Sequence, residues 1–424
     1  MQIFPASIRK VCTARFSLFA TSTAVACLFW IAGCSGGSSN SAVSAPPGLP
    51  TPPAVAASNA YTGTQDPGLW SLTLNDQQST FSYQVLASGS GASTIPAGTP
   101  VLGSTAQTNG FLTLTTGAST PAGYALEIPG RLAFLRPGDS TAALVAAVPS
   151  TTCLAINGYV TLDFISLTTN IDDVNFGQVV ASTSSDGKSY TFGNQAKYHW
   201  GNLPDLVLDQ NNSYPDIISG SCATSGGVAA ITLPVNTQNP VSPTILLGPT
   251  GFFVEDQTGV AIAQDSLSSS ASLVGLAEPL APLSAADLAG QPYVGFSSST
   301  LNSGVTATHL VSFGPASSPG SLSGGAFSND DPTLTAANNI TITFGSESST
   351  LNGFYYNATV TEPDPLLNCV LNSTGKAGLD ANGNPICTSP AAAVVGNPEG
   401  KYAIFVAEVD DAVGGYVGYY LLQQ

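Results

Sequence analysis

The residues WSLTLN (70–75) and FSYQV (81–85) alternate between apolar and polar side chains. A polar segment around Asp76 and Gln77 separates the two runs. Successive side chains of a β-strand point to opposite faces of a sheet, so a period of two predicts strands with one buried face. We therefore expect residues 70–85 to form a β-hairpin, and this pattern decides the fold class.

Similar short runs recur along the chain, separated by clusters of Gly, Pro, Asn and Ser that favour turns. They lie at 111–115, 124–128, 158–166, 189–193, 305–313, 340–344 and 353–361. The closing runs 402–409 and 416–422 are apolar on both parities, which predicts a hairpin covered on both faces, with Gly414-Gly415 in or near its turn. The whole pattern predicts an all-β chain of antiparallel barrels or sandwiches.

One short helix is expected in the middle of the chain. Ser284 is a good N-cap residue, Asp287 follows three residues later as in a capping box, and Gly290 is a stop signal. The preceding residues 278–282 contain two prolines. We therefore predict a linker with a short helix at 279–291, between a first β domain (61–278) and a second β domain (292–424).

The two predicted domains share short sequence elements. Three pairs of segments correspond: 61–63 with 293–295, 191–193 with 343–345, and 248–251 with 396–400. This indicates an internal duplication, with coincidence among common turn residues as the alternative.

The N-terminal segment has three parts. Arg9, Lys10 and Arg15 precede an uncharged apolar run (16–32), and the segment ends in Ile31-Ala32-Gly33-Cys34. This layout is typical of a secretory signal. Its ending resembles the lipobox of bacterial lipoproteins, and the resemblance covers residues 1–34.

The resemblance implies that residues 1–33 are a signal peptide, that the mature chain begins at Cys34, and that acyl chains on Cys34 anchor it to a membrane. Ser35, where an Asp would imply inner-membrane retention, implies sorting to the outer membrane of the cell envelope. An ordinary cleaved signal with a chance cysteine is the alternative. Residues 34–60 carry no charge and are rich in Ser, Gly, Pro and Ala, so we expect a disordered tether.

Four cysteines remain for the folded body: Cys153, Cys222, Cys369 and Cys387. An even number in an oxidising compartment predicts two disulfides, for which three connectivities exist. Cys222 precedes Gly248 by 26 residues and Cys369 precedes Gly396 by 27, which makes these two cysteines equivalent under the duplication. Equivalent cysteines should bond within their own domains, which favours Cys153–Cys222 and Cys369–Cys387.

Charge argues against nucleic acid as a partner. After cleavage six basic and 26 acidic residues remain, a net charge of −20 with no basic stripe to neutralise phosphates. No CxxC occurs, and the chain has two histidines, so we predict no metal ligand and no cofactor.

The candidate catalytic patterns all have simpler interpretations. His309 lies on the same face of its predicted strand as several apolar residues, so it is expected to be a core histidine. His199 is expected to pack in a loop. Residues 373–376 match the Ser-x-x-Lys spacing of penicillin-binding enzymes without their second motif. Residues 380–384 are faintly similar to a calcium loop but fit a plain Asn-Gly turn. The acidic pairs 172–173 and 330–331 could coordinate calcium, although solvated carboxylates are commoner. We therefore predict no catalytic residue.

These observations favour a lipid-anchored envelope protein with a non-catalytic binding or structural role, whose ligand is another protein or a glycan. Two alternatives stay open. The opening from Tyr61-x-Gly63 to Trp70 resembles that of lipocalins, which implies a carrier of a small apolar ligand. The second alternative is a hydrolase of extracellular polymer that uses paired carboxylates. A lined lumen would support the carrier, two carboxylates across a cleft would support the hydrolase, and a filled core would support the binding protein.

Overall fold

The computed structural model describes most of the chain from residue 58 onward. The described residues are 49, 58–64, 68–88, 97–118, 120–166, 176–200, 206–208, 217–234, 244–256, 272–300, 306–348, 352–364, 369, 375–397, 400–410 and 415–424. The predicted signal peptide, Cys34 and nearly all of the predicted tether lie outside them. In these described ranges, no helix is both long enough and apolar enough to cross a lipid bilayer.

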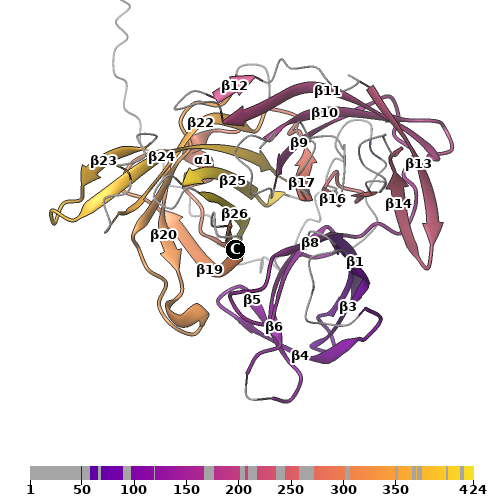
Figure 1. Ribbon diagram of the computed structural model, residues 1–424, viewed down its shortest axis with the longest axis horizontal. Helices are drawn as coiled ribbons and strands as arrows, with labels where there is room; N and C mark the ends of the chain where they lie inside the picture. The colour runs from indigo at the N-terminus through magenta and orange to yellow at the C-terminus, as the bar shows by residue number, and fades with distance from the viewer. Residues whose placement is uncertain are drawn as a thin grey trace, which may run out of the picture. The chain divides into compact units, whose positions relative to one another are not determined.

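Eight antiparallel strands form a closed barrel between residues 58 and 148 (Figure 1). They are β1 (Ser58–Thr64), β2 (Gly68–Asn75), β3 (Thr80–Ser88), β4 (Val101–Thr108), β5 (Phe111–Thr115), β6 (Gly123–Ile128), β7 (Leu132–Pro137) and β8 (Val145–Val148). The predicted hairpin 70–85 is β2–β3, with Leu72 opposite Tyr83. The barrel closes where β1 pairs with β8.

A second group of strands lies between residues 160 and 277. It comprises β9 (Val160–Ser166), β10 (Phe176–Thr183), β11 (Ser189–Trp200), β12 (Leu206–Leu208), β13 (Ile217–Ser225), β14 (Val228–Thr232), β15 (Thr244–Leu247), β16 (Phe253–Asp256) and β17 (Ser272–Ala277). Strand β17 pairs with β9, and the β10–β11 pairing completes a ring of eight strands. The short β12 is attached to β11 outside this ring.

A third group lies between residues 293 and 423. It comprises β18 (Tyr293–Thr300), β19 (Thr306–Pro315), β20 (Ser321–Ala326), β21 (Ile340–Thr343), β22 (Phe354–Pro363), β23 (Lys376–Leu379), β24 (Pro385–Gly396), β25 (Ala403–Asp410) and β26 (Gly415–Gln423). A 3-10 turn, η1 (Ser328–Asp330), follows β20. Strand β26 pairs with β18, and the β22–β24 pairing completes another ring of eight, with β23 attached to β24.

The all-β prediction is confirmed, as is antiparallel pairing on both sides of the linker. The segment predicted as the first β domain holds two rings, and the segment predicted as the second holds one. The helix is also confirmed: α1 (Ala285–Ala289) begins after Ser284, whose side chain accepts hydrogen bonds from two backbone N–H groups, and it ends at Gly290. Strand β1 begins at Ser58, so the last three residues assigned to the tether, 58–60, belong to β1.

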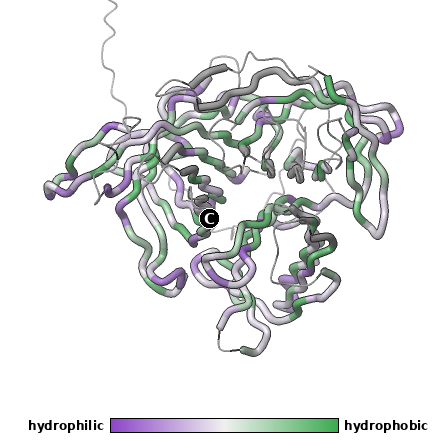
Figure 2. Tube along the Cα trace, viewed as in Figure 1, coloured by the Kyte–Doolittle hydropathy of each residue, from purple (hydrophilic) through white to green (hydrophobic). Residues whose placement is uncertain are grey.

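Side chains fill the lumen of each ring. In the first barrel Trp70, Phe81 and Tyr83 pack against one another, with ring centroids 6.1 Å apart for Trp70 and Tyr83 and 5.7 Å apart for Phe81 and Tyr83. Separate buried clusters occupy the second and third rings. Hydrophobic residues, green in Figure 2, alternate with more polar ones along many strands, as a filled lumen and a solvated outer face require.

A fourth apolar cluster lies outside the lumens and draws on all three rings. Phe134 of β7 makes an edge-to-face contact with Phe405 of β25, with centroids 5.8 Å apart. Phe176 of β10 packs against Phe354 of β22 at 5.6 Å. Strands β7, β8 and β25 supply residues both to this cluster and to a lumen, which explains why they are apolar on both parities. The predicted two-faced burial of the closing hairpin β25–β26 is confirmed.

Two glycines mark equivalent positions in the first and third rings. A Cβ at Gly63 would collide with the carbonyl oxygen of Ala146, and one at Gly295 would collide with that of Tyr420. Each glycine lies in the first strand and faces the last strand of its ring. The shared Tyr-x-Gly motif therefore permits the close approach of the two strands that close the barrel.

The architectural unit that recurs along the chain is the ring of eight antiparallel strands. Residues 248–251 follow the sixth strand of the second ring, and Gly396 ends the sixth strand of the third, so this predicted correspondence agrees with the topology. The segments 191–193 and 343–345 do not align within the rings, and neither do Cys222 and Cys369. Phe192 lies in a third strand whereas Phe344 follows a fourth, and Cys222 lies in a fourth strand whereas Cys369 follows a fifth.

Candidate functional site

Both predicted disulfides are present. Cys153 is bonded to Cys222 and Cys369 to Cys387, with Cα–Cα distances of 5.9 and 5.7 Å. The connectivity is therefore the predicted one, although the two cysteines used to derive it are not topologically equivalent.

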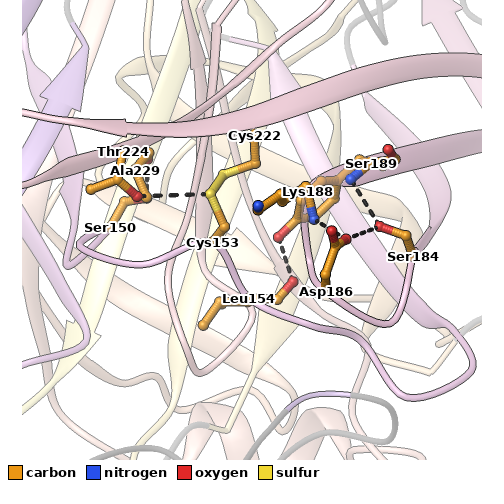
Figure 3. Close-up of a disulfide and its surroundings, with 11 residues drawn as sticks. Ser150, Cys153, Leu154, Ser184, Asp186, Lys188, Ser189, Cys222, Thr224 and Ala229 are labelled. Carbon is orange, nitrogen blue, oxygen red and sulfur yellow. Dashed lines mark hydrogen bonds between the residues drawn. A yellow bond between two sulfur atoms is a disulfide. The ribbon is translucent and has the colours of Figure 1, made fainter.

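The Cys153–Cys222 bond fastens the connection between the first two rings (Figure 3). Around it, the Tyr190 hydroxyl donates to the Leu154 carbonyl at 2.6 Å, and the Ile156 N–H donates to the Thr183 hydroxyl at 2.8 Å. Residues 150–156 are thus held to the second ring by covalent and hydrogen bonds. The next residues, 157–161, therefore begin at a position that is fixed relative to the second ring.

The linker after the second ring is fixed in the same manner. The Glu278 N–H donates to the Thr161 carbonyl at 2.9 Å, which extends the β17–β9 pairing by one residue. The Glu278 carboxylate accepts the backbone N–H of Asn352 at 2.9 Å, and the Asn352 side-chain amide donates to the Pro279 carbonyl at 3.1 Å. Glu278 therefore ties the linker to the turn before β22.

These segments enclose a groove with a volume of about 390 Å³, lined by residues 157–161, residues 278–280 and Asn352. Tyr159 and Leu280 each expose 64% of their surface at this site. Glu278 and Asn352 contribute polar groups, and the partly buried Thr161 also lines the groove. The groove combines two exposed apolar side chains with hydrogen-bonding groups, as small-molecule sites do.

A second polar cluster joins the first and third rings. Residues 308–310 of β19 extend beyond the end of β20, which pairs only from Val311 onward. Their backbone groups are satisfied by other partners: Thr308 N–H donates to the Ser140 carbonyl, and Arg136 Nη1 donates to the Thr308 carbonyl at 2.8 Å. Leu310 N–H donates to the Asp330 carboxylate at 3.2 Å. The cluster caps a strand edge, which is a structural role.

His309 belongs to this cap. Its Nδ1 donates to Asp330 at 3.1 Å, and its side chain is 43% exposed. The prediction of a buried core histidine is wrong, because β20 ends before it can cover this part of β19. The Asp330 pKa lies below its usual value: burial alone would raise it, but the hydrogen bond from His309 and the charge of Arg136 outweigh burial.

A third polar group lies at the end of the first barrel. The Tyr61 hydroxyl donates to Glu127 Oε2 at 2.5 Å and accepts the Gly130 N–H at 2.8 Å. Burial raises the pKa of Glu127 to about 7; the Tyr61 hydrogen bond opposes this shift, and the nearby Asp76 carboxylate adds to it. Glu127 thus titrates near neutrality, as a general acid would.

The remaining sequence candidates give no site. Asp380 accepts the N–H groups of Asn382 and Asn384, both at 2.8 Å, as in a plain Asx turn, and Asp331 binds the nearby Thr333 in the same way. Within the described ranges, no cluster of three or more His, Cys, Asp or Glu side chains could hold a metal ion. Cys34, residues 172–173, Ser373 and the His199 side chain lie outside what the structure describes.

The sequence and the structure were compared with known proteins. No protein-family model and no curated protein matches the sequence. Crystal structures of transferrin binding protein B show a faint likeness. A double mutant from Haemophilus parasuis Hp5 has a TM-score of 0.25 and 9% identity over 90% of this chain and 78% of that one. The isotype 1 protein from serogroup B Neisseria meningitidis has a TM-score of 0.26 and 10% identity over 84% and 66%.

The groove was missed by sequence reasoning for a physical reason. Its residues come from three parts of the chain that lie far apart in the sequence. Thr161 and Glu278, for example, are separated by 117 positions. Tyr159 follows no motif, and Glu278 was noted only as the start of a proline-containing linker. The position of the linker was the one usable signal, because clefts form preferentially where folded units meet.

Proposed function

We propose that this protein is a non-catalytic binding protein of the cell envelope, anchored to the outer membrane through acyl chains on Cys34. The N-terminal segment and its lipobox-like ending support the anchor, and the uncharged stretch after Cys34 supports a spacer between lipid and folded body. The groove at residues 157–161, 278–280 and Asn352 is the surface that contacts the ligand.

The observation that carries this proposal is the combination of filled lumens with an external groove. The lumen of the first barrel contains Trp70, Phe81 and Tyr83, each exposed by 4% or less. A carrier of the lipocalin type needs space where these side chains lie. The hydrogen bonds of Glu278 and Asn352 instead pre-form a site on the outside, which reduces the entropy lost on binding.

A hydrolase of extracellular polymer is the second candidate, and Glu127 is the observation that favours it. Its pKa of about 7 suits a general acid, and Asp76 lies close enough to influence that pKa. Glu127 also has a structural role, since it accepts the hydrogen bond of the buried Tyr61.

Two measurements test the proposal. Cells that express the full chain should incorporate labelled palmitate into the protein, and Cys34→Ser should abolish the label while Cys27→Ser leaves it unchanged. The purified lipoprotein should show no turnover on a panel of glycan and peptide polymers. Polymer turnover that Glu127→Gln abolishes would contradict the non-catalytic function and support the hydrolase. A wild-type protein that takes up no labelled palmitate would contradict the lipid anchor on Cys34.

A further inference from the structure

The groove has the chemistry of a sugar site. Tyr159 and Leu280 each expose 64% of their surface, and both line the same groove, so two apolar faces are available to one ligand. A tyrosine ring offers a flat apolar face and a polar edge. The axial C–H groups of a pyranose form an apolar face of matching shape, so the two surfaces can stack while the hydroxyl groups stay at the rim.

The polar lining complements hydroxyl groups. Glu278 uses Oε1 to accept the Asn352 N–H, and Asn352 uses its amide nitrogen to donate to Pro279. The second carboxylate oxygen of Glu278 and the amide oxygen of Asn352 are acceptors, and Asn157 supplies both donors and an acceptor. A sugar hydroxyl donates one hydrogen bond and accepts others, so adjacent hydroxyls satisfy such a set at once.

Charge narrows the ligand class. Of the residues that line the groove, Glu278 is the one acidic side chain, and the lining set contains no lysine or arginine. The mature chain is also strongly acidic. An anionic ligand such as a phosphorylated or uronic polymer would be repelled by Glu278 in the groove and by the net negative charge of the whole chain. A neutral ligand meets no such penalty.

The site is already rigid before a ligand arrives. The Cys153–Cys222 bond and the Leu154 and Ile156 hydrogen bonds fix the chain that leads into Tyr159. Glu278 fixes the opposite wall. Sugars bind weakly per contact, so a site that loses little entropy on binding is what this class of ligand needs.

We infer that the groove binds a neutral oligosaccharide, with Tyr159 as the stacking platform and Glu278 and Asn352 as acceptors for vicinal hydroxyls. This inference rests on the proposed binding function and names the ligand class for the same groove. A volume of about 390 Å³ lies near the lower end of the range of small-molecule sites, which suits one or two sugar rings.

The test uses the full-length lipoprotein in detergent and an array of neutral hexose and N-acetylhexosamine oligosaccharides, followed by calorimetry with the sugars that bind. We expect binding that weakens at least tenfold in Tyr159→Ala and in Glu278→Gln. The matched control is Tyr356→Ala, which removes a tyrosine that is 40% exposed but does not line the groove. Thermal melting checks that every variant is folded, and Tyr159 is exposed enough that its loss should not unfold the chain.

The outcomes separate the two proposals. Sugar binding that is lost in both groove variants and kept in the control supports the inference. Failure of every neutral oligosaccharide, or binding that both groove variants leave unchanged, overturns it. Selective capture of anionic glycans or of a defined peptide would also overturn it, while the non-catalytic binding function would stand. The non-catalytic, lipid-anchored function is contradicted by different measurements, namely turnover of a polymer or the absence of palmitate labelling.

Discussion

Arg136 of β7 and Asp330 of η1 form an ion pair that joins the first and third rings, with Arg136 Nη1 3.4 Å from Asp330 Oδ2. The arginine side chain is 2% exposed, and its guanidinium carbon also lies 5.0 Å from the centre of the Tyr124 ring. The pair lies beside the part of β19 that β20 does not cover. Arg136 and Asp330 therefore neutralise each other and also form hydrogen bonds with backbone groups of Thr308 and Leu310 on β19.

The first prediction concerns this pair. Asp330→Asn should lower the free energy of unfolding by about 3 kcal/mol, because it leaves the buried Arg136 without a counter-charge. Urea denaturation at neutral pH measures the change. Asp331→Asn is the matched control, since the adjacent aspartate binds only Thr333 in an exposed turn and should change stability by less than ~1 kcal/mol.

The pH dependence of this effect has a definite sign. The Asp330 pKa is lowered in the folded chain, so its contribution is present above the unfolded pKa of about 4 and is lost as the pH falls below it. The difference between wild type and Asp330→Asn should therefore shrink between roughly pH 5 and pH 3. A difference that is constant with pH would contradict the assignment of the ion pair.

Glu127 leads to a prediction of the opposite sign. Its folded pKa is raised from 4.5 to about 7, so the wild type loses stability as the pH rises through this interval. Glu127→Gln should be more stable than the wild type above pH 7, by an amount of order 1–3 kcal/mol, and the two should converge near pH 4. Denaturation at several pH values measures this, and equal pH profiles would exclude a buried titrating carboxyl.

Asp76 provides a control for the same group. Because the Asp76 carboxylate raises the Glu127 pKa, Asp76→Asn should lower that pKa toward its ordinary value. Carbon-13 NMR of the glutamate carboxyl carbons would follow the titration directly.

The two disulfides should differ in their effect. They span 69 and 18 residues, so loop-closure entropy assigns them about 4 and about 3 kcal/mol. Replacement of both Cys153 and Cys222 by alanine should lower the melting temperature more than replacement of Cys369 and Cys387. The reverse order would show that residual structure or solvation, and not chain entropy, dominates.

Gly295 tests the closure of the third ring. Gly295→Ala should destabilise the chain by about 2–3 kcal/mol, because its Cβ would overlap the Tyr420 carbonyl and push β18 away from β26. Gly314→Ala is the control, since a Cβ there meets nothing within 4 Å. Equal melting temperatures for the two variants would contradict the close approach of the strands.

The sequence predicted local structure better than long-range structure. Alternation over 70–85 specifies a hairpin because the hydrophobic pattern and the turn lie within one short stretch. Ring closure joins β1 to β8 and β9 to β17, and no local pattern records which distant strands will meet. The alternating pattern over residues 61–278 therefore did not reveal that this segment holds two rings.

The polar sites show the same division. The Asn-Gly turn at 380–384 was predicted because its hydrogen bonds are local. His309 was misplaced because parity gives the face of a strand but not where the neighbouring strand ends. Glu127, Arg136 and the groove depend on partners that lie far away in the sequence, so residue types alone could not identify them.

The order in which the rings close has a consequence for biogenesis. The first barrel is complete once residue 148 has been synthesised, whereas β18 pairs with β26, which comes much later in the chain. A chain that lacks residues 415–424 would leave β18 and β25 with bare backbone edges beside two finished barrels. Unpaired strand edges of this kind invite aggregation and binding by chaperones or proteases, so the third ring depends on residues 415–424 for its closure.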